Sequence, residues 1–178
     1  MVIQLKKFSF IKNYSLKRIL IVIFCLVIIQ QADAQSDSLP IYKRFPEIPP
    51  FSITKVPDSI KFTKDDLQKK RSTMIMLFNP DCKHCQLAIQ ELLSNITLFK
   101  NAQIVLASPM DFVELKKFYK EYKIASYPNI TVARDWTFFF GSFYVVKNFP
   151  SVYIYNIKGE LSAEFSGSLD IIKAAAAL

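Results

Sequence analysis

The chain has 178 residues, of which 51% are hydrophobic, and its formal net charge at pH 7 is +8. This length suits a single domain with a buried core. Five basic residues and one acidic residue lie within the first 34 positions, so the remainder carries a net charge of only +4. That mild excess, without a basic stripe interleaved with aromatic residues, argues against a nucleic-acid-binding protein.

Residues 1–34 have the pattern of a secretory signal peptide. Basic residues precede an apolar stretch from Ile19 to Ile29, and Ala32-Asp33-Ala34 forms an Ala-x-Ala cleavage site. The apolar stretch is shorter than the roughly 20 residues that a membrane-spanning helix needs. We therefore expect cleavage after Ala34 and export, with the bacterial periplasm as the destination. An uncleaved N-terminal anchor that holds the protein at the membrane is the alternative.

A lead-in and a β-hairpin are expected next. Residues 35–45 are predicted to be an extended lead-in, and residues 46–178 a single domain. The domain begins with two short strands, 51–54 and 60–62, which form a hairpin around a turn at Pro57.

Strands and helices then alternate along the chain. The expected order is strand 73–78, helix 83–99, strand 103–107 and helix 110–122. This order predicts βαβ units and a parallel core sheet with right-handed crossovers. Helix 83–99 is expected to bury a broad apolar stripe that includes Leu87.

The second half predicts an antiparallel addition to that sheet. Residues 127–132 read as a loop and a short strand, and 135–141 as a turn of helix. Strands 151–155 and 161–165 are joined as a hairpin, and a short helix over 170–178 closes the chain. The aromatic stretches within 137–144 are expected to be core, and Trp136, the only tryptophan, is expected to be a partly buried core or rim residue.

The motif that carries chemistry is Cys82-Lys83-His84-Cys85, between the predicted strand 73–78 and the helix after it. This placement puts Cys82 at a helix N-terminus, where unpaired N–H groups and the helix dipole favour its thiolate. The thiolate is the nucleophile of disulfide exchange, so we expect Cys82 to attack and Cys85 to resolve. Cys25 is expected to leave with the leader, since Phe24 before it does not fit a lipoprotein site.

Together these elements resemble the thioredoxin fold, and their details look most like the TlpA-like family of exported thiol–disulfide oxidoreductases. The resemblance covers about residues 46–178. It rests on the approach 48–67, the active-site block 78–85, and the stretch 144–161, which looks like a cis-proline loop and closing hairpin. The implied fold class is α/β, with a mixed central sheet flanked by helices and an N-terminal β-hairpin extension.

The resemblance also implies roles for residues outside the motif. It implies a cis peptide bond before Pro150, opposite the cysteine pair, and binding of an extended substrate along the backbone of Phe149. Two positions depart from the pattern. Asp81 replaces the tryptophan that often precedes the first cysteine, and Met76 replaces the buried aspartate that helps proton transfer to the second sulfur in thioredoxin.

Three neighbours of the cysteines are candidates for tuning the pKa of Cys82. A cation such as Lys83 or a protonated His84 lowers the pKa of an adjacent thiol and makes the disulfide more oxidising, whereas the negative charge of Asp81 opposes that shift. We therefore expect an intermediate reduction potential. Two thiolates and one histidine leave a structural zinc site incomplete, and the residues before Cys82 lack the peroxiredoxin spacing. Neither a metal nor a cofactor is expected.

The sequence therefore predicts an exported enzyme that exchanges thiols and disulfides on protein substrates, acting as a reductase supplied by an upstream redox partner. An oxidase or isomerase that uses the same two cysteines is the first alternative. The second alternative is a binding module of the same fold that keeps the pair as a stable disulfide. Exposure of Cys82 and ready reduction by small thiols distinguish an enzyme from such a module.

Overall fold

The computed structural model describes residues 17–18, 21 and 39–178. Residues 40–178 form one compact unit. The predicted signal peptide and its cleavage site lie outside the described residues, apart from three isolated positions. In the part of the chain that the structure describes, no helix is both long enough and apolar enough to cross a membrane.

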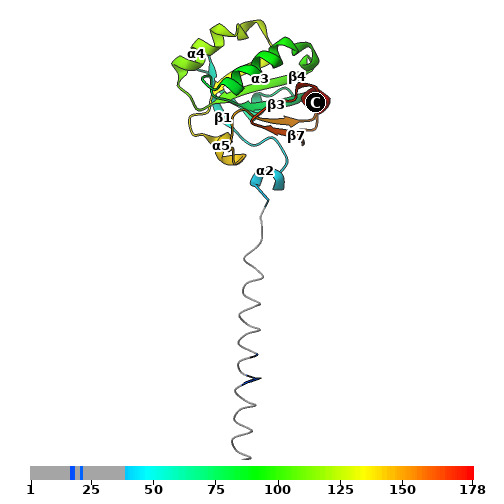
Figure 1. Ribbon diagram of the computed structural model, residues 1–178. Coiled ribbons are helices and arrows are strands. Elements are labelled where there is room, and N and C mark those ends of the chain that lie inside the picture. Colours follow the sequence, from blue (N-terminus) through cyan, green and yellow to red (C-terminus); the bar gives the residue numbers. More distant parts are fainter. Residues whose placement is uncertain (1–16, 19–20, 22–38) are drawn as a thin grey trace, which may run out of the picture. The chain divides into compact units, whose positions relative to one another are not determined.

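A seven-stranded mixed sheet forms the centre of this unit, in the order β2-β1-β5-β4-β3-β6-β7 (Figure 1). Its three central strands are parallel: β3 (Ser72–Leu77), β4 (Ala102–Ser108) and β5 (Ile130–Arg134). All six residues of β3 are buried, as expected for a strand covered on both sheet faces. The parallel core predicted from the alternating elements is confirmed.

Antiparallel strands extend the sheet at both edges. On one side β6 (Ser151–Tyr155) pairs with β3, and β7 (Leu161–Ser166) pairs with β6. On the other side the hairpin of β1 (Ser52–Val56) and β2 (Lys61–Thr63) joins the sheet through β5. The mixed sheet and its N-terminal hairpin therefore match the fold class predicted from the sequence.

Three α-helices contribute to the core on one face of the sheet. They are α3 (Lys83–Ser94), α4 (Phe112–Glu121) and α6 (Ile171–Ala176). The predicted helix 83–99 is interrupted at Asn95, after which the 3-10 helix η3 (Ile96–Phe99) follows. Short 3-10 turns also occupy Lys64–Asp66 and Ile124–Ser126.

The buried stripe of α3 is narrower than the sequence suggested. Cys85, Ala88, Ile89 and Leu92 are buried and recur at helical spacing, whereas Leu87 is 53% exposed. Two residues along a helix turn the side chain by about 200°, so Leu87 faces away from the stripe that Cys85 begins. The prediction that Leu87 is buried was wrong.

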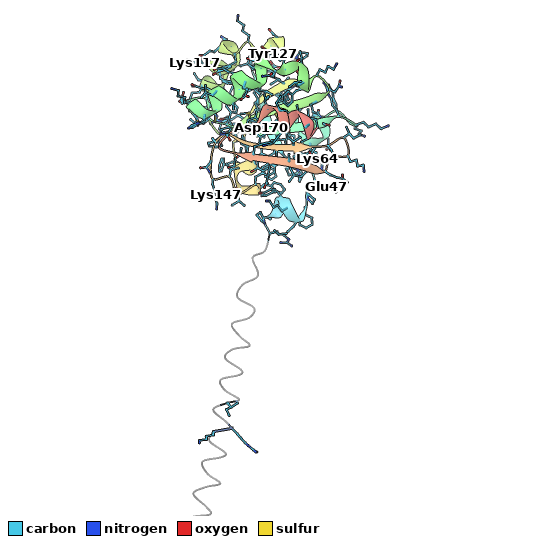
Figure 2. All side chains as sticks on the ribbon, turned by 45° about the vertical axis from the view of Figure 1, so that its right-hand side comes forward. Glu47, Lys64, Lys117, Tyr127, Lys147 and Asp170 are labelled. Carbon is cyan, nitrogen blue, oxygen red and sulfur yellow. The ribbon has the colours of Figure 1, made fainter. Side chains whose placement is uncertain are left out.

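A second, aromatic core fills the other face of the sheet, where α5 (Phe139–Phe143) and α2 (Ile41–Arg44) lie. Figure 1 shows α5 on the side opposite to α3 and α4, and in Figure 2 Lys117 of α4 is labelled toward the top of the domain and Lys147, beyond α5, toward the bottom. Tyr42 of α2 packs edge-on against Tyr144 and Tyr153, with ring centres 5.5 and 5.6 Å away.

The burial of Tyr42 corrects one prediction. Residues 35–45 were expected to be an extended lead-in, but Ile41–Arg44 form a helical turn that brings the Tyr42 ring into the aromatic core. Burying a ring of this size is favourable by about 2 kcal/mol, which outweighs the weak local preference of a proline-flanked segment. The Lys43 ammonium also lies 2.7 Å from the Glu164 carboxylate of β7.

Candidate active site

The sheet topology brings the two predicted parts of the site to one edge. Cys82 follows the carboxyl end of β3, and Pro150 immediately precedes β6, which runs antiparallel to β3. Leu77, at the end of β3, pairs with Ser151, at the start of β6. Segments far apart in the sequence therefore meet where β3 ends and β6 begins.

Cys82 and the backbone of Phe149 lie in direct proximity. The sulfur of Cys82, at the N-cap of α3, is 3.9 Å from the carbonyl oxygen of Phe149. The peptide bond between Phe149 and Pro150 is cis, as the resemblance implied. Cys82 is partly exposed, whereas Cys85, one turn into α3, is fully buried.

The loop before Cys82 is held by polar contacts that sequence reasoning missed. The Asn79 side-chain oxygen accepts a hydrogen bond from the Asp81 N–H (2.8 Å), and the Asn79 carbonyl accepts one from the Cys82 N–H (3.1 Å). The Gln86 side chain donates to the Pro80 carbonyl at 2.8 Å. The signal was present in Asn79-Pro80, since asparagine before proline favours a turn that its side chain closes.

The two thiols differ strongly in acidity. Burial by itself raises the pKa of Cys82, but interactions with the backbone N–H of Cys85, the Cys85 thiol and the backbone N–H of His84 outweigh it and lower the pKa below its ordinary value. Burial raises the pKa of Cys85 to about 12. Of the two thiols, Cys82 therefore ionises more readily and is the better candidate for the nucleophile.

The side chains predicted to tune the pKa of Cys82 are not among the groups that lower it. Asp81, Lys83 and His84 are all exposed, and the groups that lower the Cys82 pKa are the backbone of His84 and the backbone and thiol of Cys85. A helix N-terminus supplies such N–H groups whatever the side chains are. The tuning roles of Asp81, Lys83 and His84 stay predictions.

The unequal acidity leads to a labelling prediction. At about pH 7.5, iodoacetamide is expected to modify reduced Cys82 at least about tenfold faster than Cys85, because only the thiolate is alkylated. Peptide mapping by mass spectrometry measures both rates and separates them from any label on Cys25. A Cys82→Ser variant is the control and should leave Cys85 almost unlabelled. Faster modification of Cys85 than of Cys82 would contradict the assignment.

Comparison with known proteins identifies the fold. No protein-family model and no curated protein matches the chain. Solved structures do. A secreted disulfide oxidoreductase of Mycobacterium tuberculosis, homologous to Escherichia coli DsbE, is 17% identical, with a TM-score of 0.61 over 72% of this chain and 96% of that one. The fold is thioredoxin-like.

Two further solved structures share the thioredoxin-like fold. The exposed lipoprotein thioredoxin Etrx1 of Streptococcus pneumoniae is 16% identical, with a TM-score of 0.58 over 73% of this chain and 100% of that one. StoA of Bacillus subtilis is 13% identical, with a TM-score of 0.54 over 74% and 98%. The thioredoxin-like fold predicted from the sequence is confirmed.

Within this thioredoxin-like fold, the position of the missing acid is apolar. Met76 lies in β3, is fully buried, and belongs to the same core cluster as Cys85. Its side chain cannot exchange a proton with the Cys85 thiol. Among residues 39–178 and the three described leader positions, no group of three or more histidine, cysteine or acidic side chains is placed to hold a metal ion.

Proposed function

We propose that this protein is an exported thiol–disulfide oxidoreductase that reduces disulfides in protein substrates through Cys82 and Cys85. The observation that carries the proposal is the pairing of a partly exposed thiol of lowered pKa with a buried thiol of raised pKa, one helical turn apart. An exposed thiolate attacks well, and a buried thiol close to it is suited to resolving the intermediate.

The reaction has two exchange steps. The Cys82 thiolate attacks one sulfur of a substrate disulfide, forms a mixed disulfide, and expels the other substrate sulfur as a thiolate, which takes a proton. Cys85 then loses its proton and attacks the Cys82 sulfur, so the second substrate sulfur leaves as a thiol. The enzyme ends as a Cys82–Cys85 disulfide, and an upstream partner returns two electrons to it.

Formation of the mixed disulfide itself favours the second step. Burial is the largest cause of the raised Cys85 pKa. The other two causes that raise it are the hydrogen bond with the neighbouring Cys82 thiolate and the negative charge of that thiolate. Once Cys82 is bonded to substrate it is neutral, and both of these causes disappear. The pKa of Cys85 therefore falls when its thiolate is needed. This lessens the need for a carboxylate at the position of Met76 to accept the Cys85 proton.

The backbone beside Pro150 is the proposed binding surface for the substrate. The Phe149 carbonyl lies within 3.9 Å of the attacking sulfur, where an extended peptide that carries the disulfide would pass. Hydrogen bonds between the Phe149 backbone and the backbone of an extended peptide do not depend on the peptide's side chains. Such pairing accepts many sequences, which suits a protein substrate. The leader-like residues 1–34 support export to the periplasm, and a membrane location is proposed only if that leader is retained.

A glutathione redox titration combined with trapping tests this function. The protein without its leader is expected to show one reversible two-electron transition, and a Cys85→Ala variant is expected to accumulate mixed disulfides on Cys82. A potential between about −270 mV and −120 mV is expected, and its position in that range distinguishes reductase from oxidase. A disulfide that resists reduction and traps no substrate would instead identify a binding module.

A further inference from the structure

Trp136 differs from its sequence-based expectation in an informative way. It was predicted to be partly buried, yet it is 65% exposed just beyond the end of β5. A single exposed apolar residue is ordinary. The arrangement around this ring is not: the Arg134 guanidinium carbon lies 3.5 Å from the ring centre and covers one face.

The residue that supports the ring is itself fixed. An Arg134 guanidinium nitrogen donates to the Asp111 carboxylate at 2.8 Å, and the Arg134 side chain is only 14% exposed. A guanidinium stacked on an indole is attracted by the ring's negative face, and more strongly when it is partly desolvated. The ion pair positions Arg134, and the stacked guanidinium supports one face of the Trp136 ring at the surface.

The backbone on the other side of Trp136 is also held. Asp135 is 1% exposed, and its carboxylate oxygens accept hydrogen bonds from the N–H groups of Phe139 and Phe140, each at 2.9 Å. Phe138 adopts a left-handed conformation with φ of 52°. A bulky residue keeps such a conformation only where its surroundings enforce it. Trp136 therefore projects from a loop that folding has already ordered. Binding of a partner at this ring then costs little further conformational entropy of the loop.

The topology places this ring at the edge of the sheet that carries Cys82. β3, β4 and β5 are parallel, so Cys82 after β3 and Trp136 after β5 emerge at the same edge. Only β4 lies between β3 and β5, so the ends of β3 and β5 are about 10 Å apart across the sheet. Three residues of extended peptide span that distance. Phe138 and Val113, both exposed, also follow β5 and β4 at this edge.

We propose that Trp136 is a specificity-determining residue that docks the substrate polypeptide beside its reacting cysteine; this inference rests on the proposed exchange function. The side chain it selects is aromatic or aliphatic and lies about three residues from that cysteine. A basic side chain is disfavoured, because the Arg134 cation already occupies one face of the ring and the domain carries excess positive charge.

Tryptophan fluorescence and exchange kinetics test the proposal together. Because Trp136 is the only tryptophan, its emission reports directly on docking. A peptide with serine in place of its cysteine and phenylalanine three residues away is expected to shift the emission to shorter wavelength, whereas the matched alanine peptide is not. This measurement reports binding to the wild-type protein and involves no disulfide exchange.

The kinetic arm uses disulfide peptides with the same phenylalanine or alanine. Trp136→Ala is expected to lower kcat/KM for the phenylalanine peptide about tenfold and to leave reduction of glutathione disulfide unchanged. Trp136→Phe should restore most of the loss. The matched control is Ile172→Ala, which removes an equally exposed apolar side chain (66%) from α6 and should change neither rate.

The outcomes separate the two proposals. Equal rates for both peptides in the wild-type protein, or no emission shift with the phenylalanine peptide, would overturn the role of Trp136 while leaving exchange intact. If the protein reduces neither glutathione disulfide nor either of the two disulfide peptides, the exchange function itself is overturned. A phenylalanine preference that Trp136→Ala abolishes, with glutathione disulfide unaffected, supports the docking role.

Discussion

Replacing Cys82 with serine is expected to lower the rate of disulfide reduction by roughly a thousandfold or more, because a hydroxyl is almost never ionised at neutral pH and no other described thiol can attack. Cys85 cannot substitute for it, since it is fully buried and burial raises its pKa to about 12. Steady-state reduction of a protein disulfide by the wild-type and Cys82→Ser proteins measures the loss.

The pH dependence of the first step, measured as formation of the mixed disulfide in a single turnover, provides an internal check. The reactive form is the deprotonated one, so the rate of the first attack rises with pH and levels off above the pKa of Cys82, which lies below its ordinary value. Cys85→Ala removes a thiol that helps to lower this pKa, so the midpoint of the profile should move to higher pH. A midpoint that moves to lower pH, or a Cys82→Ser protein that keeps a tenth of the wild-type rate, would contradict the assignment of Cys82 as nucleophile.

The cysteine pair and the sheet were predictable because their signals are local. The apolar run that became β3 needed no knowledge of the rest of the chain, and the Cys82 position followed from a strand and a helix that meet there. The contact between Cys82 and Phe149 was different. It joins residues 67 positions apart, and only the resemblance of 144–161 to a known loop pointed to it.

Residues governed by tertiary contacts were predicted less well. Tyr42 is helical because its ring packs on Tyr144 and Tyr153, more than 100 residues away in the sequence. Trp136 is exposed because Arg134 and Asp111, brought together by β5 and α4, support it from one side. Hydrophobic character alone does not separate a core tryptophan from one that is held at the surface. The downward direction of the Cys82 pKa shift and the contribution of the helix N–H groups were foreseen, whereas the contribution of the Cys85 thiol was not.

Asp135→Ala is expected to destabilise the fold by about 3 kcal/mol, a large effect for a residue with a polar side chain. The Asp135 carboxylate is buried and accepts hydrogen bonds from the N–H groups of Phe139 and Phe140 at the start of α5. Alanine would leave both donors without a partner away from water, and the loop that links β5 to α5 would lose its anchor. Urea unfolding followed by far-ultraviolet circular dichroism measures the change.

Two companion variants identify the cause of that loss. Asp135→Asn keeps the size of the side chain but replaces one acceptor oxygen with a donor, so it should restore only part of the stability. Asp58→Ala removes an exposed carboxylate from the β1–β2 turn and should leave the urea concentration at the midpoint of unfolding unchanged. Equal stability of the Asp135→Ala and wild-type proteins would show that the two N–H groups find other partners. Because Asp135 directly precedes Trp136, its loss should also broaden the tryptophan emission of the folded protein, which links the anchor of this loop to the proposed docking surface.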